Sequence, residues 1–301
     1  MNHSFKTLEN RRRIVKLGRI LSIAVFVAGV CSILWSILWA IVLLLGGALL
    51  VVLVEQCLTK PYIKAYKERL VKEILTETIE DVRYNPIGGI PRSTIDSIGM
   101  MSIGNVYQVN DLIEGSYKGV HFSQSDIRIE QTYSEYKFLS NRTKNTTISY
   151  LKGRWLIFDF PHSFHCNLQV RDRSFAHAKR PGGWLYSRIK SEKIKAKSEA
   201  FDGTFEVYAT DESEALRLLT PGFMKAMLRA KKNSHGDVLF CFVGPKLHVA
   251  INNKRDSFEP PVWTPIHPEG AMENIAEDRD FITDLIDTLN LDERMSREGD
   301  Q

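Results

Sequence analysis

Residues 20–54 form a stretch of 35 residues that contains no charged side chain and no proline. A helix that crosses a membrane needs about 20 apolar residues, because the hydrocarbon core of a bilayer is about 30 Å thick. The stretch is therefore long for one span and slightly short for two ordinary ones. No soluble fold needs such a run, so the rest of the chain has to be interpreted relative to a membrane.

Basic residues flank the apolar stretch on both sides. They are Lys6, Arg11, Arg12, Arg13, Lys16 and Arg19 before it, and Lys60, Lys64, Lys67, Arg69 and Lys72 after it. Basic flanks favour the cytoplasmic side of a membrane. One span would leave one cluster outside, whereas two spans joined by a tight turn keep both inside. We therefore predict a transmembrane helical hairpin that turns near Leu34 to Trp39, where Trp35, Ser36 and Trp39 suit the membrane interface. The predicted interface residues are Trp35, Trp39, Arg11, Arg12 and Arg13.

The stretch has two other interpretations. A cleaved signal peptide has an apolar core of about 7–15 residues, which is far shorter than this run. A single signal anchor with the following domain outside the cytoplasm stays open. Gly29, and Gly46 with Gly47 and Ala48, would let two helices approach closely. Glycine is common in membrane helices, however, and we favour that simpler explanation.

The remaining composition limits the class of protein. The formal net charge is +4 with 25% charged residues, which gives no reason to expect binding to nucleic acid. Only Cys166 and Cys241 lie in the soluble part. Two cysteines without a framework suit a reducing compartment, although a single disulfide is not excluded. The glycosylation patterns at Asn141 and Asn145 are chance matches if that part is cytoplasmic.

Residues 60–82 have apolar residues at helical spacing and a graded charge, basic first and acidic later. We predict a juxtamembrane amphipathic helix within residues 55–84. Its cations Lys60, Lys64, Lys67 and Arg69 would lie beside anionic headgroups, each adding on the order of 1 kcal/mol. A connector with a solvated charged face explains the same pattern.

Strand patterns follow the glycines and prolines of residues 85–91. We expect strands at residues 106–113, 120–129, 153–160 and 168–170, with a polar loop at residues 140–147. Trp155, Ile157, Leu156 and Phe158 make residues 153–160 apolar on both faces, which predicts a central strand.

The last third alternates strands and helices. Residues 194–198 and 205–209 are expected to pair about an Asp202–Gly203 turn. Asp211 and Thr220 are expected caps of two helices, a hairpin should cover residues 237–251, and a helix residues 272–289. The fold class is therefore α+β: a mostly antiparallel sheet with flanking helices after the hairpin. The predicted parts are a basic cytosolic N-terminus (1–19), two transmembrane helices (20–54), the juxtamembrane helix (55–84), a soluble α+β domain (85–290, with subdomains 85–190 and 191–290 as an option) and a polar tail (291–301).

Residues 171–188 form a basic segment with aromatic side chains around Pro181 to Trp184. Such a segment is able to hold an anionic headgroup or ligand, although a solvated loop is the more common case. The candidates for a lipid or partner surface here are Arg171, Arg173, Arg180 and Trp184.

The sequence contains no constellation typical of catalysis. His162, His165 and Cys166 are the nearest approach to a metal cluster, but zinc needs about four converging ligands. No phosphate loop, dinucleotide motif or nucleophile elbow is present. Asp159, Glu206 and Glu259 are acids in apolar surroundings that more often pair with a cation than act in catalysis. We predict no catalytic residue, no metal and no cofactor.

The order of motifs resembles a known family. These motifs are Tyr117 to Val120, Gly153 to Pro161, Phe205 to Ala209, Glu214 to Pro221 and the hairpin from Phe240 to Ile251. They resemble the bacterial membrane proteins catalogued as domain of unknown function 3137. The resemblance implies a bacterial inner-membrane protein with a cytosolic domain, and it carries over no catalytic or ligand residue.

Two functions from different classes follow from these observations. The first is a membrane-anchored cytosolic interaction or scaffold module that contacts anionic lipid headgroups or a protein partner in the membrane. It would be a multi-pass inner-membrane protein with both termini and the soluble domain in the cytoplasm. The alternative is a membrane-tethered enzyme whose site is assembled from residues distant in the sequence.

Overall fold

The computed structural model describes residues 2–99, 103–137, 142–174, 189–289 and 291. These residues form two compact units. Unit 1 contains Met1–Leu75 together with Phe258–Glu277, and unit 2 contains Thr76–Ser257 together with Asp278–Gln301. Each unit therefore combines segments that are distant in the sequence.

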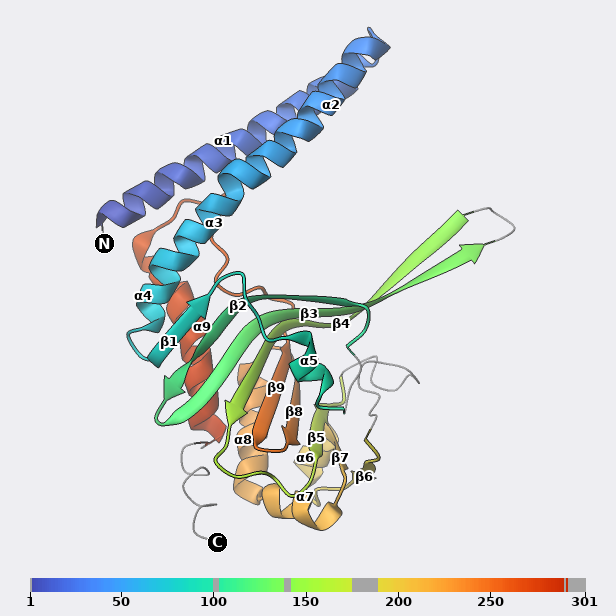
Figure 1. Ribbon diagram of the computed structural model, residues 1–301, viewed down its shortest axis with the longest axis vertical. Coiled ribbons are helices and arrows are strands. Elements are labelled where there is room, and N and C mark those ends of the chain that lie inside the picture. The colour runs from blue at the N-terminus through green and yellow to red at the C-terminus, as the bar shows by residue number, and fades with distance from the viewer. Residues whose placement is uncertain (1, 100–102, 138–141, 175–188, 290, 292–301) are drawn as a thin grey trace. The chain divides into compact units, whose positions relative to one another are not determined.

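Unit 1 is built on two antiparallel helices (Figure 1). Helix α1 (Asn2–Ser32) is followed by a short turn and by α2 (Ile37–Val54). The chain then stays helical through η1 (Glu55–Thr59), α3 (Lys60–Tyr66), η2 (Lys67–Val71) and α4 (Lys72–Leu75). The backbone N–H of Trp35 and of Ser36 both donate to the Ser32 carbonyl, which closes the turn. The predicted turn near Leu34 to Trp39 overlaps the observed one.

Unit 2 contains a nine-stranded antiparallel sheet in the order β1-β2-β3-β4-β9-β8-β5-β7-β6. Its strands are β1 (Glu80–Asn85), β2 (Val106–Tyr117), β3 (Val120–Lys137), β4 (Arg142–Asp159), β5 (Leu168–Asp172), β6 (Glu192–Ile194), β7 (Phe205–Ala209), β8 (Asp237–Val243) and β9 (Lys246–Asn252). Its helices are α5 (Arg92–Asp96), α6 (Glu199–Thr204), α7 (Glu212–Leu218) and α8 (Pro221–Asn233), and α9 (Pro268–Leu289) begins in unit 1. The α+β class and the mostly antiparallel sheet are confirmed.

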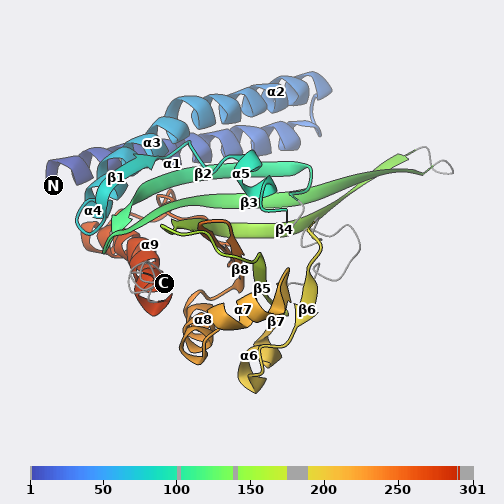
Figure 2. The ribbon, with the colours of Figure 1, turned by 60° about the horizontal axis from the view of Figure 1, so that its bottom comes forward.

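Each face of the sheet has its own apolar layer, because side chains alternate along a strand. Trp155 and Ile157 lie on one face with Ile95 of α5. Phe158 and Phe242 lie on the other face, where Phe242 packs edge-on against Phe223 of α8. The helices α5 and α8 lie on opposite sides of the sheet in Figure 2. The prediction that residues 153–160 form a central strand buried on both faces is confirmed, since β4 is the fourth of nine strands.

Several local expectations differ from the structure. The juxtamembrane helix ends at Leu75 rather than near residue 82, because Glu80–Asn85 pairs with β2 as strand β1. Residues 142–147, expected in a loop, extend β4 by pairing with β3. The expected Asp202–Gly203 turn lies within helix α6, where Asp202 accepts hydrogen bonds from the backbone N–H of Ala196 and Ser198. Asp211 and Thr220 cap α7 and α8 as predicted.

Candidate membrane-interface site

The two helices of unit 1 are joined by an ion pair at one end of their apolar stretch. Arg19 of α1 lies 3.1 Å from the carboxylate of Glu55, which directly follows α2. Residue 19 precedes the uncharged stretch of residues 20–54 and residue 55 follows it. Residues 20–54 therefore all lie on one side of this ion pair, and the turn at residues 33–36 forms the end of the stretch that is farthest from the pair.

The apolar side chains beyond the Arg19–Glu55 pair are exposed rather than packed in a core. Among the described residues, 21 of the 24 exposed large hydrophobic side chains lie between Ile14 and Leu53. Both helices are long and apolar enough to cross a membrane, and only 17% of the most apolar window in each is buried. The 18 residues of α2 span about 27 Å at 1.5 Å per residue, close to the thickness of a bilayer core. The predicted interface residues Trp35, in the turn, and Trp39, in the first turn of α2, are 93% and 64% exposed.

Two glycines allow α1 and α2 to approach closely. A Cβ atom on Gly29 would lie 3.1 Å from the backbone nitrogen of Leu44, and one on Gly47 would lie 3.3 Å from the backbone of Phe26. A Cβ atom on Gly46 would meet nothing within 4 Å. The view that these glycines merely reflect membrane-helix composition is therefore wrong for Gly29 and Gly47, while Gly46 has no contact that requires glycine.

The predicted basic residues fall into two groups. Lys60, Lys64 and Arg69 on the helices after α2 are exposed, as are Arg11 and Arg13 on α1. Lys67 is 3% exposed and binds Glu259 at 2.5 Å, so it is not available on the surface. Arg12 is 4% exposed and binds Glu9 at 2.7 Å, so it too is held inside the protein. Only the exposed members of the set are in a position to face headgroups.

A proline-rich segment of unit 1, residues 258–267, lies along the base of the hairpin and is called the strap here. Three successive carbonyls of the strap each accept a hydrogen bond from a helix side chain. Tyr62 donates to Pro261 at 2.7 Å, Arg12 to Val262 at 3.0 Å and Lys16 to Trp263 at 3.3 Å. The backbone N–H of Ile266 donates in turn to Glu9 at 3.0 Å. The sequence shows the prolines but not these contacts, which join residues about 200 to 260 positions apart.

The second predicted basic surface is only partly described. Arg171 of β5 is 7% exposed; it donates to Glu206 of β7 at 3.0 Å and stacks on the Tyr208 ring. Lys193 of β6 binds the other oxygen of Glu206 at 2.9 Å, and exposed Arg173 lies 3.7 Å from it. Burial raises the pKa of Glu206, but hydrogen bonds from Lys193 and Arg171 outweigh it, so the pKa is lowered overall. Arg180 and Trp184 lie outside the described residues.

Unit 2 contains a buried polar network that sequence patterns did not reveal. Arg154 of β4 donates to Ser257 Oγ at 2.7 Å and binds the carboxylate of Asp278 on α9. The backbone N–H and the hydroxyl of Ser257 both donate to Asp126 of β3. Burial raises the pKa of Asp126 to about 8, even though Arg154 and Ser257 act in the opposite direction. No local pattern marks this network, because its members come from residues 126 to 278.

Three titratable side chains on neighbouring strands of unit 2 contact one another. His121, Asp159 and Lys246 form a row across β3, β4 and β9, with His121 2.7 Å from Asp159. Burial raises the pKa of Asp159, but Lys246 and His121 lower it more. His162 and His165 are exposed whereas Cys166 is buried, so the three do not share one environment.

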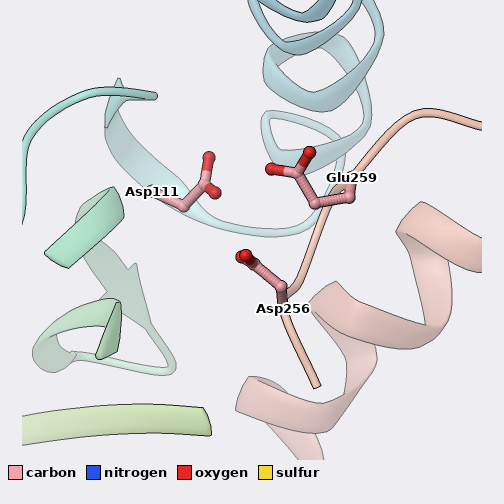
Figure 3. Close-up of side chains that lie close together, drawn as sticks. All are labelled: Asp111, Asp256 and Glu259. Atoms are coloured by element: carbon pink, nitrogen blue, oxygen red, sulfur yellow. The ribbon is translucent and has the colours of Figure 1, made fainter. Parts of the chain in front are cut away.

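Three carboxylates are drawn in Figure 3, and two of them belong to unit 2. Asp111 lies on β2 and Asp256 in the segment after β9, and the side-chain amide of Asn110 donates to both, at 2.8 Å and 3.1 Å. Tyr84 of β1 also donates to Asp111. The third, Glu259, belongs to unit 1, where it binds Lys67. The two aspartates thus have polar partners inside their own unit.

Comparison with known proteins gives one family and one distant structure. A family described as protein of unknown function (DUF3137) matches residues 149–291. The solved structure of the mycobacterial trehalose monomycolate transport factor A, TtfA, is 11% identical, covers 72% of this chain and 94% of that chain, and has a TM-score of 0.36. No curated protein matches the chain. From within strand β4 to just beyond the end of α9, the chain therefore resembles the DUF3137 family. The motifs from Gly153 to Ile251 lie in this range, whereas Tyr117 to Val120 lies outside it.

Proposed function

We propose that the chain is a membrane-anchored interaction or scaffold module. In this proposal the α1–α2 hairpin crosses the bilayer twice, and both termini and unit 2 lie on the cytoplasmic side of a bacterial inner membrane. Unit 2 then binds a partner at that membrane surface, and the exposed cations near the hairpin base contact anionic headgroups. The role is one of holding and presenting a folded domain beside the bilayer.

The observation that carries this proposal is the uneven distribution of charge along the hairpin. The cations of residues 6–19 and those of residues 60–72 all lie on the same side of the Arg19–Glu55 pair, because α1 and α2 are antiparallel. The opposite end carries Trp35, Ser36 and Trp39 and no charged side chain. Lysine and arginine are retained on the cytoplasmic side during insertion, and tryptophan favours the interface. This pattern supports two spans with both ends inside.

Labelling of single cysteines tests the topology. The native Cys57 is exposed and lies just beyond Glu55, whereas Trp35 is the most exposed residue of the turn. In a Cys31→Ser background, Cys57 should react with a membrane-impermeant maleimide only in inverted vesicles. In the same background with Cys57→Ser, a Trp35→Cys variant should react with the same maleimide in spheroplasts, in which the outer face of the inner membrane is accessible.

Two cysteines provide an internal control for this experiment. Cys166 and Cys241 are buried, and burial raises the pKa of their thiols to about 11 and about 12, so both should stay unlabelled without denaturant. Labelling of Cys57 in intact cells would overturn the proposed orientation. Labelling of both positions from one side would contradict a hairpin that crosses the bilayer.

The lipid contact is tested separately with residues 60–301. These residues should float with vesicles that contain anionic lipid and less with neutral vesicles, because each exposed cation near the surface adds on the order of 1 kcal/mol. Lys60→Glu with Lys64→Glu should remove the difference. The matched control is Lys67→Met, whose side chain is buried and paired. Equal flotation with both lipids would contradict the headgroup contact and leave the protein-partner part of the proposal.

A further inference from the structure

We propose that the strap is a third membrane contact, in which Trp263 inserts into the headgroup layer beside the hairpin base. This inference rests on the proposed function, since it requires the hairpin to lie in a bilayer. It assigns a new surface, the exposed apex of the strap, and one occupant for it, the lipid interface. The strap and every helix residue that contacts it belong to unit 1.

The first observation is the exposure of the Trp263 side chain. Among the described residues, three exposed large hydrophobic side chains lie outside residues 14–53, namely Ile87, Tyr133 and Trp263. The first two belong to unit 2. Trp263 is 50% exposed, and its neighbours Thr264 and Pro265 are exposed as well. An indole that is half out of the protein fits the membrane interface, because it has an apolar ring and one polar N–H.

The second observation is the height of each strap contact along the hairpin. The distance along the helix axis from the Arg19–Glu55 pair is taken as 1.5 Å per residue. On this scale the backbone of Lys67 lies about 18 Å from the pair and that of Arg12 about 10 Å. Lys16 lies only about 5 Å away, and Glu9 lies about 15 Å away. The strap contacts these side chains in chain order at Glu259, Val262, Trp263 and Ile266. The strap therefore approaches the apolar stretch from Glu259 to Trp263 and leads away from it again from Trp263 to Ile266.

The height of the apex matches the position of lipid headgroups. The hydrocarbon core is about 30 Å thick and the whole bilayer about 40–45 Å, so each headgroup layer is about 5–8 Å deep. If the Arg19–Glu55 pair marks the edge of the hydrocarbon, Trp263 lies within that layer. On α1, the helix that carries Lys16, the apolar side chains Ile14 and Leu17 are also exposed, at 53% and 65%.

The strap holds this apex in place before any lipid is met. Pro260, Pro261 and Pro265 fix their own backbone φ angles, which reduces the conformational freedom that the segment would lose on binding. The carbonyls of Pro261, Val262 and Trp263 are already bound by helix side chains. The Trp263 ring is thus presented from a fixed backbone.

Quenching by brominated lipids tests the inference in the full chain reconstituted in vesicles. In a Trp35→Phe, Trp39→Phe, Trp184→Phe background, only Trp155 and Trp263 remain, and the emission lost on adding Trp263→Phe isolates the signal of Trp263. Bromine atoms near the top of the acyl chains should abolish most of this difference signal, and bromine atoms near the bilayer centre should affect it less. Trp155 is fully buried in the sheet, and its emission in the variant that also carries Trp263→Phe serves as the unquenched reference.

Two results would overturn the inference. If the Trp263 emission is quenched by aqueous acrylamide but by neither brominated lipid, the apex of the strap lies in water. If the Trp263 emission is quenched neither by the brominated lipids nor by acrylamide, protein covers the Trp263 side chain.

A second background separates this inference from the proposed function. With Trp39→Phe, the emission lost on adding Trp35→Phe isolates Trp35, which the proposed hairpin places at the far interface. Quenching of Trp35 without quenching of Trp263 would overturn the strap contact alone. Absence of lipid quenching for both would overturn the membrane hairpin and the strap contact together.

Discussion

Arg154 on strand β4 binds the carboxylate of Asp278 on helix α9, and both side chains are largely buried. Through its Nε atom the same arginine also donates to Ser257, which holds Asp126 of β3. The Arg154 guanidinium further lies over the ring of Phe281 on α9. One cation thus joins two central strands, the end of the segment after β9 and the last helix of unit 2.

Removal of this cation should strongly destabilise unit 2. Arg154→Met leaves the largely buried carboxylate of Asp278 without its cation, a change that typically costs about 3–5 kcal/mol. Chemical denaturation of the detergent-solubilised chain, with the other four tryptophans replaced by phenylalanine and followed by the emission of buried Trp155, measures the loss. Arg217→Met is the matched control, because Arg217 forms an exposed i,i+3 pair with Glu214 and should change stability by less than about 1 kcal/mol. Equal effects of the two substitutions would contradict the role assigned to Arg154.

The pKa of Asp126 predicts how the stability of unit 2 depends on pH. Burial raises this pKa from 3.8 to about 8, so the folded state binds a proton that the unfolded state releases between these values. The free energy of unfolding should therefore decrease as pH rises toward 8, and Asp126→Asn should remove that decrease.

One histidine contributes to the same measurement with the opposite sign. Burial lowers the pKa of His248 from 6.5 to about 3, so its contribution grows as pH rises to about 6.5 and is constant above it. The window from about pH 6.5 to 8 therefore reports Asp126 with His248 held constant. Parallel curves for the wild type and Asp126→Asn in that window would show that the Asp126 carboxyl titrates normally.

The neighbouring glycines Gly46 and Gly47 should respond differently to the same substitution. Gly47→Val forces a side chain against the backbone of Phe26, while Gly46→Val enters open space. We expect Gly47→Val to separate α1 from α2 and Gly46→Val to leave them in place. The measurement is the yield of a short bis-maleimide cross-link between cysteines at positions 19 and 55, in a Cys31→Ser, Cys57→Ser background. A similar yield in both variants would contradict the close approach.

The cations around Glu206 should bind anionic lipid more strongly once that carboxylate is neutralised. Arg171, Arg173 and Lys193 all lie within 3.7 Å of Glu206, and the lowered pKa of this acid keeps it charged at neutral pH. Glu206→Gln should increase flotation of residues 60–301 with anionic vesicles, and Arg173→Glu should decrease it. High salt should weaken both effects, since exposed charges are screened. Unchanged flotation would show that this surface does not face lipid.

The features that the sequence predicted correctly depend on local patterns. The two antiparallel apolar helices follow from the long uncharged run, and their crossing of a membrane stays a prediction. The caps at Asp211 and Thr220 follow from one side chain and its own helix. The central position of β4 follows from apolar residues on both of its faces. Each of these signals lies within about 35 residues, so pairing across the chain is not needed to recognise it.

The features that the sequence did not predict depend on distant pairing. Polar residues 123–126 interrupt the apolar alternation of β3. Asp126 is nevertheless buried, because it accepts a hydrogen bond from Ser257, which lies 131 positions away in the sequence. Lys67 was assigned to the surface, but Glu259, 192 positions away, holds it inside unit 1. Likewise, the polar residues 142–147 form a strand because β3 lies beside them. In each case the partner determines burial, and no local pattern identifies the partner.

The short turn at residues 33–36 has a consequence for how such a chain would be inserted during synthesis. The apolar parts of α1 and α2 both start at the Arg19–Glu55 pair, so in the proposed topology only the turn and its adjacent residues would be carried to the far side. The turn has the sequence Ile-Leu-Trp-Ser and carries no charged group. Insertion would then translocate no folded domain and no ion, and the transfer of the apolar legs from water into lipid would itself be the driving force.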